Sequence, residues 1–267
     1  MPKVRLDLLL VERGLAESRA KAQALVMAGQ VRVDEQVELK ASAKILPEAR
    51  LELEMGPRFV SRGGDKLEAA LLAFPVDVSG RICADVGAST GGFTDCLLQY
   101  GAAKVYTIDV GKGILHWKLR SDPRVVVMEE TNARYVQSLP EPVSLVTIDA
   151  SFISLRILLP VVKNWLPSIL GKDAGGEGEV LALIKPQFEA GRKESAKHKG
   201  VIRDPAVHKA ILANILTFAH AQGFGVRGLV RSPVLGPKGN VEFLAWLSLV
   251  YVEQTDFATL VDQVTLE

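Results

Sequence analysis

Two features are scarce in this sequence. It has only two cysteines, Cys83 and Cys96, in 267 residues, which is too few for a disulfide framework in a chain of this length. No stretch approaches the ~20 apolar residues that a membrane-crossing helix needs, and the start Pro2-Lys3-Val4-Arg5 leads into a helical pattern rather than a signal peptide. We therefore expect a cytoplasmic protein with two buried thiols.

Metal-ligand spacing and a strong net charge are also missing. The four histidines, His116, His198, His208 and His220, show no ligand pattern, so we expect surface or loop positions and no metal site. The formal net charge is +1, which gives no global sign of nucleic-acid binding, so a role with RNA must depend on a local basic patch. The length fits one α/β domain with a small appendage.

The central motif is residues 85–95, where an apolar run meets a glycine turn and then a helical pattern. The apolar residues 81–86 predict a strand that is covered on both faces of a parallel sheet. Gly87, Gly91 and Gly92 allow a sharp turn and a close approach to a ligand, and residues 93–100 have helical spacing that stops at Gly101. The motif predicts a cofactor crevice at the carboxyl end of the strand.

The nature of the cofactor follows from what the turn lacks. A dinucleotide site needs a second glycine where this chain has Ser89, and the turn carries an acid, Asp85, where a phosphate would lie. S-adenosylmethionine has a positive sulfonium and no phosphate, so it fits better, although a merely tight turn is the alternative. Asp109 ends the next strand at a position suited to a ribose diol, and Asn132 could read an adenine edge. The expected cofactor-binding residues are Asp85, Gly87, Ser89, Gly91, Gly92, Phe93, Asp109, Asn132 and Asp149.

Ionisable residues stand at the ends of other apolar runs. Asp149 follows the expected strand 143–148, and Lys185 follows the expected strand 179–184. Lys66 lies in the first turn of a helix expected to begin near Gly64 or Asp65, and Glu242 starts an otherwise apolar strand. Further strands are expected at 104–109, 124–128, 226–231 and 241–249. Buried charges need partners or a substrate, so we expect these four side chains to converge on one site.

The first 55 residues predict a small module of two helices and short strands with an uneven charge. Residues 1–32 carry six Lys or Arg against three acids, whereas residues 33–55 carry three against six. Arg19 and Lys21 begin the second helix, where they could contact phosphates, although a solvated helix face is the simpler alternative. Residues 185–209 carry seven basic residues against three acids and predict a basic flap. The expected RNA-binding residues are Arg5, Arg19, Lys21, Arg32, Arg192 and Lys193.

Two runs carry a family resemblance. Residues 5–22 and the turn Ala28-Gly29-Gln30-Val31-Arg32-Val33 resemble the RNA-binding domain named after the small-subunit ribosomal protein S-four. The motif at 85–95, Asp149-Ala150-Ser151-Phe152, Lys185-Pro186-Gln187-Phe188-Glu189 and Val241-Glu242-Phe243 resemble the TlyA family, which is sometimes labelled haemolysin A. The resemblance covers essentially the whole chain.

The resemblance implies a fold and a reaction. The fold is a Rossmann-like α/β methyltransferase domain of the FtsJ type with a seven-stranded sheet, at 65–267, a linker at 57–64 that couples the domains, and a small α+β RNA-binding domain at 1–56. The reaction is 2′-O-methylation of cytidine in ribosomal RNA or ribosomal subunits from S-adenosylmethionine, with the catalytic tetrad Lys66, Asp149, Lys185 and Glu242. We expect Lys185 to act as base or alkoxide stabiliser, Lys66 to tune it, and the carboxylates to orient both.

Two other classes of function remain open. One is a membrane-active haemolysin, which the historical label suggests but which no apolar span or lytic helix in the sequence supports. The other is an RNA-binding assembly factor without catalysis, against which the complete tetrad argues. The target nucleotide and the oligomeric state do not follow from the sequence.

Overall fold

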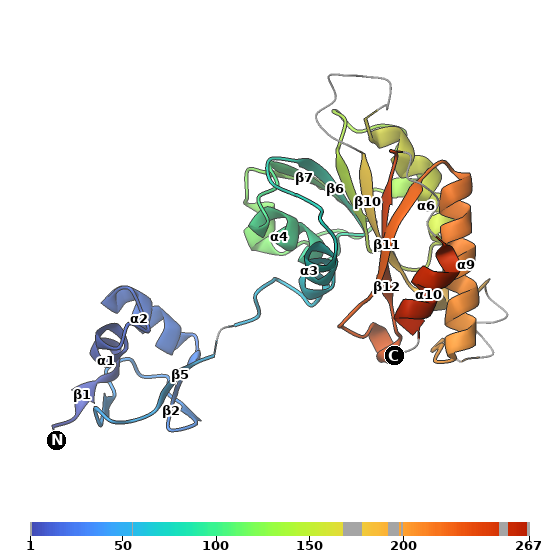
Figure 1. Ribbon diagram of the computed structural model, residues 1–267. Helices are drawn as coiled ribbons and strands as arrows, with labels where there is room; N and C mark the ends of the chain where they lie inside the picture. Colours follow the sequence, from blue (N-terminus) through green and yellow to red (C-terminus); the bar gives the residue numbers. More distant parts are fainter. Residues whose placement is uncertain are drawn as a thin grey trace. The chain divides into compact units, whose positions relative to one another are not determined.

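The chain folds into two compact units. The computed structural model describes residues 2–54, 56–167, 178–191, 198, 200–250 and 256–265. Contacts divide the chain into Met1–Arg58 and Phe59–Glu267, and Figure 1 shows both units with their element labels. Each unit has its own hydrophobic core.

The first unit packs two helices on short strands. Helices α1 (Leu6–Glu12) and α2 (Arg19–Met27) bury Leu6, Leu10 and Val26 in its core. Ser18 caps α2, accepting a hydrogen bond from the Lys21 backbone N–H at 3.2 Å. The antiparallel strands β3 (Gln36–Val37), β2 (Val31–Val33) and β5 (Leu51–Leu53) form one sheet, and β1 (Val4–Arg5) pairs with β4 (Lys44–Ile45).

The second unit is built on a seven-stranded sheet, as the sequence predicts. The strand order is β11-β12-β10-β9-β6-β7-β8, and β12 alone of these seven runs antiparallel to its neighbours. The carboxyl ends of the other strands therefore meet at one edge, where β12 begins. The strands are β6 (Ile82–Val86), β7 (Lys104–Ile108), β8 (Val125–Met128), β9 (Leu145–Ile148), β10 (Glu179–Ile184), β11 (Gly225–Arg231) and β12 (Phe243–Ser248).

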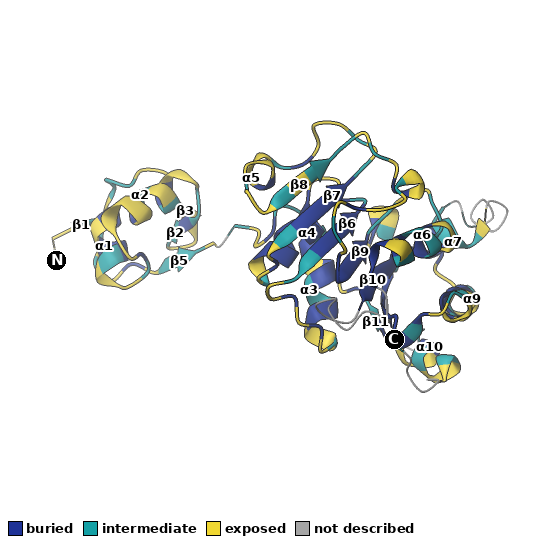
Figure 2. Cartoon of the chain, turned by 90° about the horizontal axis from the view of Figure 1, so that it is seen from above, coloured by how far each residue is buried: buried dark blue, intermediate teal, exposed yellow. Residues whose placement is uncertain are grey.

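Helices cover both faces of this sheet, so its strands are mostly buried (Figure 2). Residues of α3 (Gly63–Ala73), α4 (Gly92–Gln99) and α5 (Trp117–Arg120) join one core cluster. Residues of α6 (Leu155–Val162), α9 (Pro205–Ala221) and α10 (Phe257–Thr265) join the other. The short elements are η1 (Ala133–Tyr135), η2 (Lys163–Trp165), α7 (Pro186–Glu189) and η3 (Pro237–Gly239).

The start of α3 differs from the expected linker at 57–64. Helix α3 begins at Gly63, and Phe59 is buried in the second unit. A Cβ on Gly64 would lie 2.1 Å from the Phe59 ring, and one on Gly92 would lie 2.8 Å from the Gly64 nitrogen. Gly64 therefore makes room for the Phe59 ring, and Gly92 allows the start of α3 to approach α4 closely.

One histidine also differs from expectation. His208 is buried on α9, where its Nε2 lies 3.0 Å from the Ile202 carbonyl oxygen and its ring meets Phe243 edge-on. Both cysteines are buried free thiols. In the described part of the chain, no helix is long and apolar enough to span a membrane, and no cluster of three potential metal ligands occurs.

Candidate active site

The glycine turn after β6 separates two cavities. Gly87 has φ 83°, and a Cβ there would lie 2.7 Å from the Asp149 carbonyl oxygen, so the turn can pass close to the end of β9 only with glycine at this position. A cavity of about 320 Å³ lies on one side of the turn and another of about 280 Å³ on the other. Both are lined by Gly87, Ser89, Asp149 and Ser151, so they meet at the end of β9.

The larger cavity has the features of an adenosine site. Asp109 lies at its wall and accepts hydrogen bonds from the backbone N–H groups of Ser89, at 2.8 Å, and Gly111, at 2.7 Å. These bonds fix the carboxylate, and each oxygen keeps a lone pair for a ribose hydroxyl. Asn132 also lines this cavity, but its Oδ1 accepts from the Arg134 N–H at 3.1 Å, so its amide N–H₂ is the group that remains for an adenine edge.

The smaller cavity contains the catalytic candidates. Lys66 reaches it from α3, while Asp149 and Lys185 reach it from the ends of β9 and β10. Gly92 and Phe93, at the start of α4, line the same cavity. Gly91 lies beneath, where a Cβ would collide with Leu119, so it supports the turn rather than the cavity wall.

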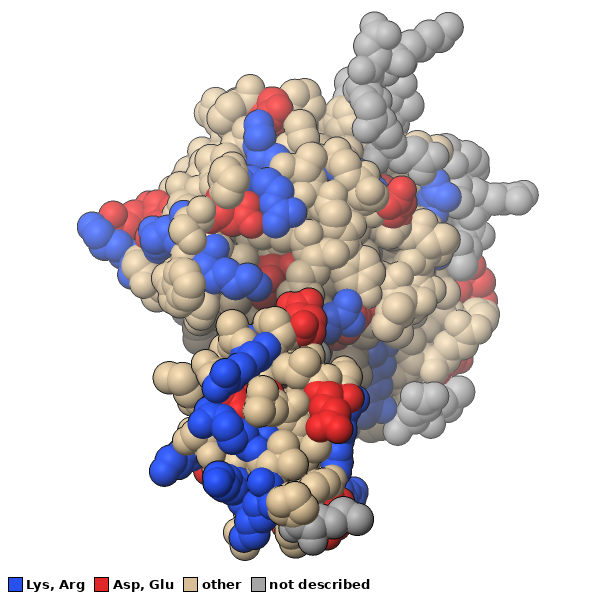
Figure 3. Space-filling model, turned by 90° about the vertical axis from the view of Figure 1, so that its left-hand side faces the viewer, with Lys and Arg blue, Asp and Glu red and all other residues tan. Residues whose placement is uncertain are grey.

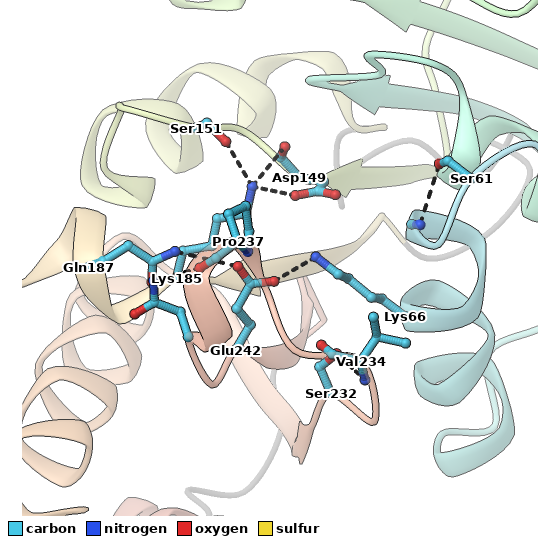
Figure 4. A network of polar contacts seen from close by, with 12 residues as sticks. Ser61, Lys66, Asp149, Ser151, Lys185, Gln187, Ser232, Val234, Pro237 and Glu242 are labelled. Atoms are coloured by element: carbon cyan, nitrogen blue, oxygen red, sulfur yellow. Dashed lines mark hydrogen bonds and ion pairs between the residues drawn. The ribbon is translucent and has the colours of Figure 1, made fainter. Parts of the chain in front are cut away.

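The four tetrad candidates form two ion pairs (Figure 4). Lys66 Nζ lies 2.6 Å from Glu242 Oε2, and Lys185 Nζ lies 2.5 Å from Asp149 Oδ1. Both lysines are almost fully buried, and Glu242 is completely buried. Because each buried lysine is paired with one carboxylate, the two positive and two negative charges of the site nearly cancel.

Glu242 is confined from three directions. Besides Lys66, the Gln187 amide Nε2 donates to Glu242 Oε1 at 3.4 Å. A Cβ on Gly236 would lie 2.1 Å from Glu242 Oε1, so the turn before β12 closes over the carboxylate. Glu242 does not itself line the cavity, whereas Lys66 does. It therefore acts on the cavity through its ion pair with Lys66.

Asp85 lies deeper than its expected role as a cofactor ligand requires. It is fully buried and lines neither cavity. Its carboxylate accepts hydrogen bonds from Thr94 Oγ1 at 2.7 Å and Thr147 Oγ1 at 3.2 Å. Burial raises the pKa of Asp85 to about 7, although these hydrogen bonds oppose the shift. Asp85 therefore joins β6, β9 and α4 beneath the turn.

Sequence reasoning missed two residues of the loop after β9. Ser151 Oγ accepts a hydrogen bond from Lys185 Nζ at 3.0 Å. Phe152 has φ 64° and is 90% exposed, with its ring 4.9 Å from that of Phe188. A bulky residue at positive φ with an exposed ring is strained and unusual. The sequence signal for both was the run Asp149-Ala150-Ser151-Phe152, which carries part of the family resemblance but assigns neither residue a role.

The expected RNA-binding residues of the first unit are partly tied to acids. Arg5 and Arg19 both bind the buried Asp7, with Arg5 Nη2 at 2.9 Å and Arg19 Nε at 3.0 Å from Oδ2. Arg5 holds the pKa of Asp7 well below its usual range. Arg32 Nε lies 2.8 Å from Glu54 Oε1. Lys21 lies in the first turn of α2, and the expected flap residues Arg192 and Lys193 lie outside the described residues.

These pairs still leave donors for a ligand. Among the described residues Arg19 is bound through Nε alone, so its two terminal nitrogens can donate elsewhere. On the face drawn in Figure 3, several Lys and Arg side chains gather with acids between them. On this face the basic side chains therefore form patches that acidic side chains interrupt.

Comparison with known proteins places this geometry in a family. Residues 59–249 match the FtsJ-like methyltransferase model, and residues 4–51 match the S4 domain model. The chain is 50% identical to YqxC of Bacillus subtilis over 252 residues, covering 92% of this chain and 85% of that protein. It is 42% identical to the 16S/23S rRNA (cytidine-2′-O)-methyltransferase TlyA of Mycobacterium tuberculosis, covering 92% of this chain and 90% of that protein.

A solved structure from Streptococcus thermophilus, titled a hemolysin, has a TM-score of 0.72 and 42% identity, covering 100% of this chain and 95% of that one. The sheet, the glycine turn with its two cavities and the two lysine–carboxylate pairs thus occur in a chain that belongs to the FtsJ-like methyltransferase family, in the branch that contains TlyA.

Proposed function

We propose that this protein transfers a methyl group from S-adenosylmethionine to a ribose 2′-hydroxyl of ribosomal RNA. The observation that carries the proposal is the smaller cavity, in which Lys66, Asp149 and Lys185 line a space that shares Gly87 and Asp149 with the larger cavity. A reacting hydroxyl and a methyl donor could meet there.

The residues present fit S-adenosylmethionine. Asp109 and Asn132 are suited to the ribose and the adenine, and Gly87 lines the same cavity without a side chain that would narrow it. Gly92 and Phe93 line the side on which the methionine part would lie. When bound, the cofactor supplies an electrophilic methyl group on a positively charged sulfur.

The protein's own residues would then position and deprotonate the hydroxyl. Holding the ribose oxygen in line with the methyl group can contribute up to ~7–11 kcal/mol, and general-base help contributes roughly 10²–10⁴ in rate. Lys185 is the candidate to receive the proton or stabilise the alkoxide, because it ends β10 at the cavity wall. Asp149 holds it on one side, and the Lys66–Glu242 pair supplies a second fixed cation.

The identity of the RNA rests on relatives and on the first unit. The name of the M. tuberculosis relative specifies cytidine in 16S and 23S rRNA, and we propose the same nucleotide and the same two rRNAs as substrates of this chain. The S4 domain, with Arg5, Arg19, Lys21 and Arg32, would bind the rRNA or an assembled subunit. Such a substrate implies action in the cytoplasm.

The direct test is transfer of a radiolabelled methyl group to ribosomal subunits that lack the modification, followed by mapping of the labelled sugar. We expect labelled 2′-O-methylcytidine with the wild type and none with Lys185→Ala, while cofactor affinity stays within about threefold because Lys185 lies at the substrate side. Label on a base, or full turnover by Lys185→Ala, would contradict the proposal. Release of dye from liposomes by the protein without cofactor would favour the hemolysin alternative.

A further inference from the structure

The hydroxyl of Ser151 makes a contact to the tetrad that the proposed function leaves without a role. Ser151 lies two residues after Asp149 in the exposed loop that follows β9. Its Oγ is 3.0 Å from Lys185 Nζ, as Figure 4 shows. A surface serine thus reaches a lysine that is almost completely buried.

Lys185 has three acceptors around its nitrogen. They are Asp149 Oδ1 at 2.5 Å, the Asp149 carbonyl oxygen at 3.3 Å and Ser151 Oγ at 3.0 Å. Two of these contacts, to Ser151 Oγ and the Asp149 carbonyl oxygen, are hydrogen bonds that take two of the three N–H donors of the ammonium group, whereas the contact with Asp149 Oδ1 is an ion pair without hydrogen-bond geometry. A ribose oxygen that approaches Lys185 from the side of Ser151 therefore replaces that hydroxyl.

Ser151 is the partner best able to yield. Asp149 Oδ1 carries charge and is buried, so losing its cation would be costly, and the carbonyl oxygen is fixed by the backbone. The Ser151 hydroxyl is neutral and exposed, and it can turn about one bond. It can also donate a hydrogen bond to the nitrogen when Lys185 is unprotonated, which neither oxygen of Asp149 can do.

We propose that Ser151 is a positioning residue for Lys185, resting on the proposed methyl transfer. Its hydroxyl keeps the lysine nitrogen at the cavity wall before the ribose enters and gives up that contact to the 2′-oxygen. Ser151 therefore prepares the direction from which Lys185 meets the hydroxyl, without itself touching the transferred methyl group.

The first test separates kcat/KM for the RNA from KM for the cofactor in Ser151→Ala, Ser151→Thr and the control Ser121→Ala, whose wild-type hydroxyl contacts backbone carbonyls of α5. Loss of a hydrogen bond that holds the charged lysine before the ribose enters predicts a fall in kcat/KM for the RNA of about tenfold to hundredfold for Ser151→Ala. Ser151→Thr keeps the hydroxyl and should restore kcat/KM to within about threefold. The cofactor KM should change little. An unchanged kcat/KM for the RNA with a raised cofactor KM would make Ser151 a cofactor contact and overturn the proposal.

The second test needs no RNA, so it stands even if the wild type methylates none. Purified protein is treated with an amine-acetylating reagent, and acetylation of Lys185 is measured by peptide mass spectrometry relative to the surface residue Lys209. Ser151→Ala should raise the relative rate of acetylation at Lys185 severalfold, because the lysine nitrogen has lost a hydrogen-bond acceptor. Ser151→Thr, which keeps the hydroxyl, should not. Equal rates in all variants would show that Ser151 does not position the lysine.

Discussion

Glu242 places a full negative charge where no solvent reaches it. Its carboxylate is matched by Lys66 at 2.6 Å. Replacing it by glutamine keeps the side-chain volume but leaves the Lys66 ammonium beside a neutral amide. We expect Glu242→Gln to lose about 3–5 kcal/mol of unfolding free energy in urea titrations and most of its methyl-transfer activity.

A matched surface pair provides the control. Lys209 Nζ and Asp262 Oδ1 lie 2.6 Å apart, with side chains 37% and 53% exposed. Asp262→Asn should cost less than about 1 kcal/mol, because exposed ion pairs contribute little. Similar losses in the two variants would mean that the buried pair does not hold Lys66.

Asp85 should make the second unit less stable as the pH rises. Burial raises the pKa of Asp85 to about 7, whereas an unfolded aspartate loses its proton near pH 4. Between about pH 4 and 7 the unfolded chain therefore releases a proton that the folded protein keeps, so the free energy of unfolding falls with pH. Above about pH 7 both states are ionised and this contribution no longer changes.

Urea unfolding at pH 5 and pH 7.5 checks this expectation. Asp85→Asn has no proton to lose, so its stability should fall less between the two pH values than that of the wild type. The difference between the two proteins isolates Asp85 from other titrating groups. If the free energy of unfolding falls by the same amount in the wild type and the variant, the pKa of Asp85 in the folded protein is not raised.

Among the elements, the segment between β11 and β12 contributes Glu242 to the site and also shapes the space around its carboxylate. Gly236 leaves the space that Glu242 Oε1 occupies, since a Cβ would lie 2.1 Å away. Gly236→Ala should displace Glu242 and with it Lys66, so we expect a fall in kcat of at least about tenfold. Methyl-transfer kinetics on ribosomal subunits measure it.

Gly80→Ala serves as the comparison for this change. Gly80 has φ 71° but no neighbouring atom within 4 Å of an added Cβ, so alanine there brings backbone strain without a collision at the site. It should lower stability slightly and leave kcat near the wild-type value. A loss of activity in Gly80→Ala as large as in Gly236→Ala would attribute both effects to general destabilisation.

Local sequence patterns predict the strands well because apolar runs between breakers need no distant information. The expected strand 179–184 coincides with β10, and the expected turn at Gly101 has φ 91°. The start of α3 was missed because the close contact of Gly63 and Gly64 with Gly92 of α4, which a Cβ on Gly92 would prevent, cannot be read from local spacing.

The arrangement of the site was predictable only in part. Strand ends indicated that Asp149 and Lys185 meet, because parallel strands finish at one edge. Which lysine pairs with which carboxylate depends on β12 entering the sheet between β10 and β11 in the opposite direction. The depth of Asp85 and the burial of His208 likewise follow from tertiary packing rather than from their neighbours in the chain.

For the molecule as a whole, the proposed function assigns RNA binding to the first unit and methyl transfer to the second. Arg19→Ala and Lys21→Ala should each weaken RNA binding by about the same factor whatever the RNA sequence. Each should also lower the slope of log affinity against log salt concentration by the contribution of roughly one phosphate contact. The slope of log affinity against log salt concentration is measured by filter binding to rRNA at about 50 to 200 mM salt, a range that includes physiological ionic strength. Methyl transfer at saturating RNA should be unchanged.

Arg50→Ala is the matched control for this pair. Arg50 belongs to the same unit but lies among acids, with Glu52 Oε1 at 2.5 Å. Its removal should leave the salt slope unchanged. A slope reduced equally in Arg50→Ala and Lys21→Ala would indicate that RNA responds to the net charge of the unit rather than to the α2 surface.

The reversed direction of β12 has a consequence for how this architecture can diverge. Lys185 ends β10 and Glu242 precedes β12, two strands paired over their full length from Glu179 with Ser248 to Ile184 with Phe243. The ladder, not the intervening polypeptide, sets the spacing between these two side chains. Insertions and deletions among the 56 positions from 186 to 241 can therefore leave the lysine and the glutamate in register, provided that Gln187 and Gly236 keep their places beside Glu242.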